Sequence, residues 1–189
     1  MNRESLIAPE TYNVVSEIEK YAGDPDRKAL QWEDEQGNQE EITYAELITN
    51  ANKIGNAFKE GGLQKGDKVL IMIPRLIEAY QVYVGALKAG LVVIPSSEML
   101  RTKDLQYRIS HGEVSGVVSY HPYTGQFKDI KEIDALKKFT VGGAVEGWTF
   151  LDELLDQNKV AAELEMANTS RNDMAFLSYT SGTTGNPKG

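Results

Sequence analysis

The stretch KVLIMIPRLIEAYQVYVGALKAGLVVIP, Lys68 to Pro95, decides the fold class. It opens with KVLIMIP, residues 68–74, a continuous apolar run that is typical of a strand covered on both faces. Residues 75–90 are apolar on nearly every side, which predicts a buried helix that Gly90 closes. The apolar run LVVIP, residues 91–95, is the next strand. Strand, helix and strand in this order predict a right-handed βαβ unit with parallel strands.

Upstream of this unit, the sequence predicts two helices and a hairpin. Residues 9–23 contain apolar side chains at helical spacing, and residues 28–43 indicate a hairpin with its turn at 36–38. The sequence TYAE, Thr43 to Glu46, is a capping box: the threonine hydroxyl can accept the amide hydrogen of Glu46, and the glutamate can reach back. The helix that it opens is expected to end at Glu60.

Downstream, strands and helices continue to alternate. This alternation predicts an α/β fold in which a layered, mostly parallel sheet is flanked by helices. The expected elements are a helix at 102–112 with Thr102 as N-cap, a strand at 114–120, a short strand at 139–143, a helix at 149–157 capped by Thr149, a polar connection at 159–172 and a strand at 174–180.

Composition excludes several classes of protein. The 189 residues contain no cysteine, so disulfides, thiol nucleophiles and cysteine-ligated zinc are excluded. Twenty Lys and Arg against 28 Asp and Glu give a net charge of -8, and without a basic run we expect no nucleic-acid partner. No apolar stretch approaches the roughly 18 residues of a membrane span, and we expect a cytoplasmic protein. The composition leaves the oligomeric state open.

The last stretch of the sequence, YTSGTTGNPKG, Tyr179 to Gly189, has the composition of an anion-binding loop. It offers four hydroxyls within five residues, two glycines that let an anion approach the main chain, and one lysine. These are the parts of a polyphosphate cradle. It is not a Walker A loop, because Pro187 precedes Lys188 and a glycine stands where that motif needs Ser or Thr.

The same eleven residues resemble the phosphate-loop signature of the adenylate-forming enzymes, which include acyl-CoA synthetases, firefly-type luciferases and nonribosomal-peptide adenylation domains. ITYAEL at 42–47, GLQKGDKVLIMIPR at 62–75 and GALKAGLVVIPSS at 85–97 resemble further conserved segments of that superfamily. Residues 73–81 and 88–109 are most similar to the acetyl- and medium-chain acyl-CoA synthetase branch.

The resemblance implies a domain organisation and an activity. Residues 1–189 would be the front part of one large N-terminal AMP-binding domain that stops inside the phosphate loop, with the C-terminal domain absent. The activity implied is the ATP-dependent, AMP-forming conversion of a carboxylic acid, such as a fatty acid, to acyl-adenylate and then acyl-CoA. ATP, Mg²⁺ and coenzyme A would serve the full-length enzyme, no metal ligand is expected in this chain, and the fragment alone would be inactive.

The resemblance also implies a role for each residue of the loop. Lys188 would be the catalytic residue, acting as a mobile clamp on phosphate and not as a base. The residues expected to bind the β- and γ-phosphates are Thr180, Ser181, Gly182, Thr183, Thr184, Gly185, Asn186, Pro187 and Lys188.

Other readings remain open. The protein could be another adenylating enzyme, such as a peptide-synthetase adenylation domain or a luciferase-like oxygenase, or a non-catalytic module that binds an anion or a partner. His111 is interpreted as structural, just before a C-capping glycine. Arg75 either faces phosphate or coenzyme A or lies on the surface. Arg101, Lys103 and Arg108 are interpreted as a solvated helix face, with a site for the phosphates of coenzyme A as the alternative.

Overall fold

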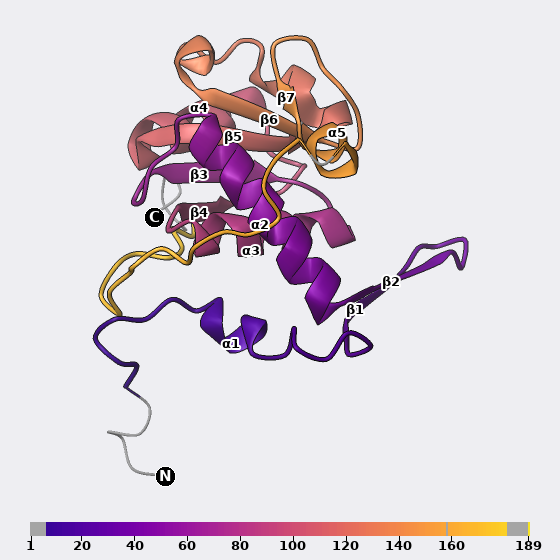
Figure 1. Ribbon diagram of the computed structural model, residues 1–189. Coiled ribbons are helices and arrows are strands. Elements are labelled where there is room, and N and C mark those ends of the chain that lie inside the picture. Colours follow the sequence, from indigo (N-terminus) through magenta and orange to yellow (C-terminus); the bar gives the residue numbers. More distant parts are fainter. Residues whose placement is uncertain (1–6, 158, 181–188) are drawn as a thin grey trace.

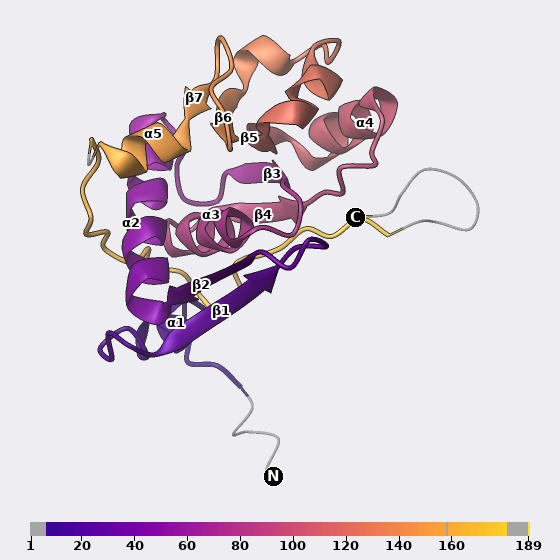
Figure 2. The ribbon, with the colours of Figure 1, turned by 90° about the vertical axis from the view of Figure 1, so that its right-hand side faces the viewer.

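The computed structural model describes residues 7–157, 159–180 and 189. Its centre is a five-stranded sheet in the order β4-β3-β5-β6-β7, in which every neighbouring pair is parallel, beside a separate antiparallel hairpin (Figures 1 and 2). The strands are β1 (Lys28–Glu33), β2 (Gln39–Thr43), β3 (Lys68–Met72), β4 (Val92–Pro95), β5 (Val114–Tyr120), β6 (Lys137–Val141) and β7 (Thr149–Phe150).

The helices cover the sheet on both faces, as the continuous apolar strands predict. On β3, Val69 and Ile71 join the core that α2 and α3 cover, whereas Leu70 and Met72 join the core under α4. All four side chains are completely buried. The helices are α1 (Ser16–Glu19), α2 (Tyr44–Glu60), α3 (Ile77–Lys88), α4 (Thr102–Gly112) and α5 (Leu151–Asp156), with short 3₁₀ turns η2 (His121–Phe127) and η3 (Ile133–Ala135).

The helices α2 and α3 approach each other closely through glycine. A Cβ built on Gly85 would lie 2.6 Å from the carbonyl oxygen of Ala51, and one on Gly55 would lie 3.0 Å from the carbonyl oxygen of Gly85. Both distances are shorter than a normal non-bonded contact. The backbones of the two helices are therefore in direct contact, with no room for a side chain between them.

The βαβ unit, the hairpin and the capping box predicted from the sequence are confirmed. Strands β3 and β4 pair in parallel around α3, and the backbone adopts a positive φ of 78° at Gly90, where the helix was expected to close. At the start of α2, the amide of Glu46 donates to the Thr43 hydroxyl over 3.2 Å, and the Thr43 amide donates to the Glu46 carboxylate over 2.9 Å. The helix at 102–112 and the strand at 114–120 have their predicted bounds.

Two predicted elements are wrong in extent. The helix expected within residues 9–23 is reduced to the four residues of α1. Its expected first turn is absent because the Tyr12 amide donates to the carbonyl oxygen of Thr169 and pairs with that distant segment instead. Thr149 is not a helix cap. It lies in the last strand, β7, where it pairs with Phe139 of β6, and α5 begins two residues later.

The polar connection at 159–172 has no regular element, as predicted, but it packs tightly against α2. Val160 and Leu164 are buried in the main core. The side-chain amide of Asn52 donates to the carbonyl oxygen of Ala162 over 2.9 Å, and that of Asn56 donates to the carbonyl oxygens of residues 161 and 163 over 2.8 Å each. The first part of the connection is therefore fixed to the helix.

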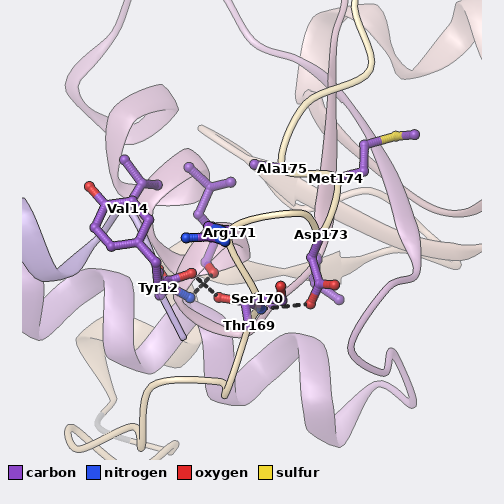
Figure 3. A pocket seen from close by; sticks show the side chains of 12 residues that line it. Tyr12, Val14, Thr169, Ser170, Arg171, Asp173, Met174 and Ala175 are labelled. Atoms are coloured by element: carbon purple, nitrogen blue, oxygen red, sulfur yellow. Dashed lines mark hydrogen bonds between the residues drawn. The ribbon is translucent and has the colours of Figure 1, made fainter. Parts of the chain in front are cut away.

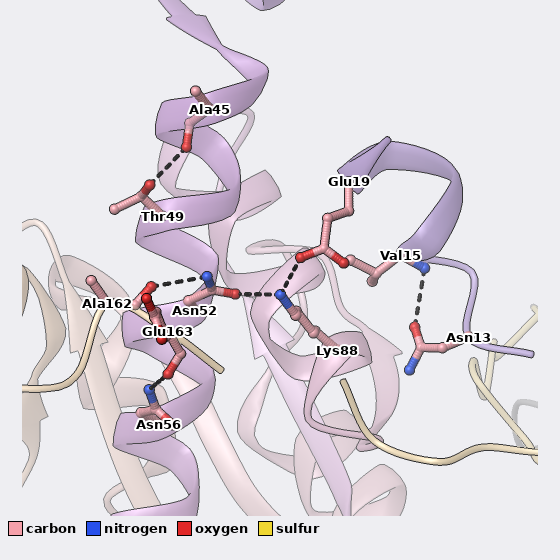
Figure 4. A network of polar contacts seen from close by, with 10 residues as sticks. All are labelled: Asn13, Val15, Glu19, Ala45, Thr49, Asn52, Asn56, Lys88, Ala162 and Glu163. Atoms are coloured by element: carbon pink, nitrogen blue, oxygen red, sulfur yellow. Dashed lines mark hydrogen bonds and ion pairs between the residues drawn. The ribbon is translucent and has the colours of Figure 1, made fainter. Parts of the chain in front are cut away.

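A buried lysine links three helices (Figure 4). Lys88 is only 3% exposed, and its ammonium group lies 2.6 Å from the carboxylate of Glu19 on α1 and 2.7 Å from the side-chain oxygen of Asn52 on α2. A charge removed from water is tolerated only where it is paired and hydrogen-bonded. These contacts satisfy the lysine and hold α1, α2 and α3 together. Among the described residues, no helix is both long and apolar enough to cross a bilayer.

Candidate functional site

The sheet continues beyond β4 with residues 174–177. The Val93 amide donates to the carbonyl oxygen of Ala175, and the Leu177 amide donates to that of Val93, each over 2.9 Å. Phe176 forms a parallel bridge with Val93. The strand predicted near residue 174 therefore exists as a short parallel pairing. It carries the chain to the carboxyl edge of the sheet, where open α/β sheets bind their ligands.

The structure places only the first of the predicted phosphate-binding residues. Thr180 is exposed and lies three residues beyond this extra strand. The remaining predicted residues lie outside the described part of the chain, so their roles, including that of Lys188 as catalytic residue, stay predictions. They are Ser181, Gly182, Thr183, Thr184, Gly185, Asn186, Pro187 and Lys188.

Tyr179, the residue before Thr180, is held by side chains from α4. Its hydroxyl oxygen lies 2.9 Å from Nδ1 of His111. The ring of Tyr107 meets the Tyr179 ring edge-on at a centroid distance of 6.3 Å, and the Arg108 guanidinium carbon lies 5.1 Å from the Tyr179 ring centroid. The structural role expected for His111 is thus a contact with Tyr179, the residue that precedes the predicted loop.

Two glycines border the same tyrosine. A Cβ on Gly112 would lie 3.1 Å from the Tyr179 hydroxyl oxygen, and a Cβ on Gly189 would lie 2.8 Å from carbon Cε1 of the ring. Gly112 was expected as the C-capping residue, but the left-handed conformation falls on Glu113, with φ 50°. A glycine is needed at position 112 because a side chain there would crowd the Tyr179 hydroxyl. The chain leaves Tyr179 at Thr180 and lies against the Tyr179 ring again at Gly189.

Arg108 is half-buried at this position, so the prediction of a solvated helix face is wrong for it. Its Nη1 makes long contacts of 3.4 Å to the Pro95 carbonyl oxygen and the Ser96 hydroxyl, just after β4. Its Nε is buried without a hydrogen-bond partner among the described residues. Burial lowers the pKa of Arg108, with Tyr179 and Asp104 opposing the shift, and an arginine nevertheless stays charged at neutral pH.

Burial raises the pKa of the Tyr179 phenol, and the neighbouring Tyr107 acts in the same direction. The phenol therefore keeps its proton at neutral pH. It can donate to His111 when the imidazole carries its own proton on Nε2. The spacing of Tyr107 and His111, four residues apart on one helix face, was the sequence signal that could have indicated this cluster.

The other cationic candidates stand apart from Tyr179. Arg101 and Lys103 are exposed, as the sequence prediction requires. Arg101 takes the N-cap position of α4 that was expected for Thr102, whose hydroxyl donates instead to the carbonyl oxygen of Gln126. The carbonyl oxygen of the exposed Arg75 accepts a hydrogen bond of 2.6 Å from the indole of Trp32, which fastens the hairpin to the sheet.

A cavity of about 190 Å³ lies at the opposite end of β4 from this site (Figure 3). Its lining includes Leu91, immediately before the strand, together with Tyr12, Thr169 and Met174. It is therefore distinct from the carboxyl edge to which Tyr179 and Thr180 belong. In the part of the chain that the structure describes, no three His, Cys, Asp or Glu residues come together as a metal site.

Comparison with known proteins identifies relatives over the whole chain. The sequence profile of the family described as AMP-binding enzyme matches residues 18–189. An uncharacterised acyl-CoA ligase of Bacillus subtilis, YtcI, is 49% identical over 189 residues, which are 100% of this chain and 35% of that protein. The mitochondrial acyl-coenzyme A synthetase ACSM5 of Mus musculus is 31% identical over 186 residues, 96% of this chain and 32% of that protein.

A solved structure agrees with the fold. ATP-bound MatB from Rhodopseudomonas palustris superimposes with a TM-score of 0.78 at 26% sequence identity, over 94% of this chain and 34% of that one. The chain spans about a third of the length of the curated relatives that it matches.

Proposed function

Since this chain belongs to the AMP-binding enzyme family, we propose that the whole protein activates a carboxylic acid with ATP and transfers the acyl group to coenzyme A. The relatives with the acyl-CoA ligase and synthetase names support this reaction. In this proposal residues 1–189 form the front part of one large AMP-binding domain. A fatty acid is the proposed acid, and the cytoplasm the proposed compartment, which a cysteine-free sequence fits.

The proposed reaction has two steps. A carboxylate oxygen attacks the α-phosphorus of ATP, the bond from that phosphorus to the bridging oxygen breaks, and pyrophosphate leaves. The thiol of coenzyme A then gives up its proton to solvent, its sulfur attacks the acyl carbon, and AMP leaves as the bond from that carbon to the phosphate oxygen breaks and the thioester forms. The first step places negative charge on phosphate oxygens, which preorganised amide, hydroxyl and ammonium donors stabilise.

The position of Thr180 carries the proposal for the loop. The added parallel strand delivers Tyr179 and Thr180 to the carboxyl edge of the sheet. Because nucleotides bind at this edge in open α/β sheets, we assign the β- and γ-phosphates to Thr180 through Lys188, with Lys188 as a mobile clamp. Mg²⁺ enters only as the ion that accompanies ATP. The described residues offer no ligand cluster for it.

Acid-dependent exchange of labelled pyrophosphate into ATP by the full-length protein tests the proposal, with thioester formation measured separately. We expect both activities, and no thioester from residues 1–189 alone. Exchange without thioester formation would indicate another kind of adenylating enzyme. Absence of exchange across a panel of short, medium and long acids, together with absence of ATP binding, would overturn the proposal.

A further inference from the structure

We propose that His111 is a positioning residue for ATP, which acts through its contact with the Tyr179 hydroxyl. The inference rests on the proposed function, because it assigns the residue that fixes the base of the phosphate loop. It concerns the described residues on α4 and those at the two ends of the loop, Thr180 and Gly189.

The geometry converges on Tyr179 from one helix. The hydroxyl meets His111 at 2.9 Å, the ring meets Tyr107 edge-on, and the Arg108 guanidinium lies over it. His111 in turn stacks on Tyr107, with ring centroids 5.2 Å apart. The tyrosine is thus restrained at its hydroxyl and on its ring, and its hydrogen bond gives its orientation a single preferred direction.

The same tyrosine marks both ends of the loop. Thr180 follows it directly, and the position that a Cβ of Gly189 would occupy is 2.8 Å from its ring. Bringing the two ends of a loop together costs conformational entropy, and so does ordering a loop around a ligand. Because Tyr179 precedes Thr180 and lies against Gly189, holding Tyr179 in place through His111 should lower the ordering cost of binding ATP.

The contact between His111 and Tyr179 lies at the exposed edge of the packed core. His111 is exposed, and the half-buried Tyr179 packs only against the edge of the core beneath α4, whose fully buried residues include Leu105 and Ile109. Loss of one peripheral hydrogen bond should therefore leave the sheet intact. Its effect should be seen in the binding of ATP and not in the binding of the acid, because the proposal assigns this loop to the phosphates of ATP.

The test is a double-mutant cycle in the full-length protein with His111→Leu, Tyr179→Phe and the pair together. Each single variant is expected to raise the KM for ATP in pyrophosphate exchange by about five-fold, the effect of one net hydrogen bond, with the KM for the acid unchanged. The double variant should show no further increase. His111→Asn, which keeps a polar group near the position of Nδ1, should retain most of the wild-type affinity.

Tyr80→Phe is the matched control, because Tyr80 is 47% exposed on α3 and lies outside this cluster. Additive effects in the double variant, or equal increases in the KM values for ATP and acid, would overturn the inference. Hydrogen–deuterium exchange gives a second readout that does not depend on activity: His111→Leu should accelerate exchange in the peptide that begins at Tyr179. If the wild type shows no pyrophosphate exchange, the proposed function fails, and unchanged hydrogen exchange would then reject the positioning role separately.

Discussion

The contact between α2 and α3 predicts that Gly85→Ala destabilises the protein although alanine favours helices. Replacing a helical glycine by alanine gains about 1 kcal/mol in an exposed helix. Here the new Cβ would lie 2.6 Å from the Ala51 carbonyl oxygen, 3.1 Å from the Ile54 side chain and 3.2 Å from the Gly55 amide. Two of these three atoms belong to the backbone and cannot rotate away. Overpacking costs roughly 1–3 kcal/mol, and we place this clash in the upper half of that range. After the gain of about 1 kcal/mol in helix propensity is subtracted, we expect a net loss of stability of about 1–2 kcal/mol.

Urea unfolding at constant slope measures this loss as a lower midpoint, accompanied by a fall in Tm of roughly 2–4 °C per kcal/mol. Gly55→Ala should cost less, because its nearest contact, at 2.4 Å, is the end of the flexible Leu164 side chain. Gly23→Ala is the control, since nothing lies within 4 Å of the added Cβ. A Gly85→Ala protein as stable as the wild type, or more stable, would show that the two backbones do not meet.

Three further predictions concern the loop, the buried lysine and the start of α2. In the full-length enzyme, Lys188→Ala should lower the rate of pyrophosphate exchange more than it weakens binding of the acid; equal effects on both would reject the clamp. Lys88→Met should reduce the free energy of unfolding by about 2 kcal/mol, since it removes hydrogen bonds of a charged group. Lys28→Met, which removes the exposed ion pair with Glu41, should change it by less than about 0.5 kcal/mol. Similar losses in the two variants would contradict the burial argument. Thr43→Ala should cost about 1 kcal/mol as a lost helix cap. The Thr43 amide and hydroxyl lower the pKa of Glu46 from its ordinary 4.5, so the contribution of Glu46 to stability is complete above that value and is lost as the pH falls below it. Chemical unfolding at neutral and acidic pH should therefore show a smaller acid-induced loss of stability in Thr43→Ala than in the wild type.

The sequence was sufficient for several elements that a neighbour in the chain determines, although the caps expected at Thr102, Gly112 and Thr149 were wrong. The apolar run at β3, the buried helix and Gly90 identified the βαβ unit, because the periodicity of burial and the glycine stop are local signals. The capping box between Thr43 and Glu46 was found for the same reason. These elements define the α/β class and the edge of the sheet that the candidate site occupies.

The features that the sequence could not supply depend on residues far apart in the chain. His111 and Tyr179 are separated by 68 positions, and Asn52 and Ala162 by 110. Neither pair has a local pattern that names its partner. The expected helix near the N-terminus starts later than predicted for a similar reason, because Tyr12 pairs with Thr169.

That last pairing has a consequence for how the chain is made. The Thr169 hydroxyl donates to the Tyr12 carbonyl oxygen across 157 positions, and the Tyr12 amide is satisfied by the same residue. A ribosome that adds roughly 5–20 residues per second leaves Tyr12 without this partner for about 8–30 s. During translation the segment around Tyr12 therefore stays solvated and unpaired, and it can pack against the rest of the chain only after Thr169 has left the ribosome.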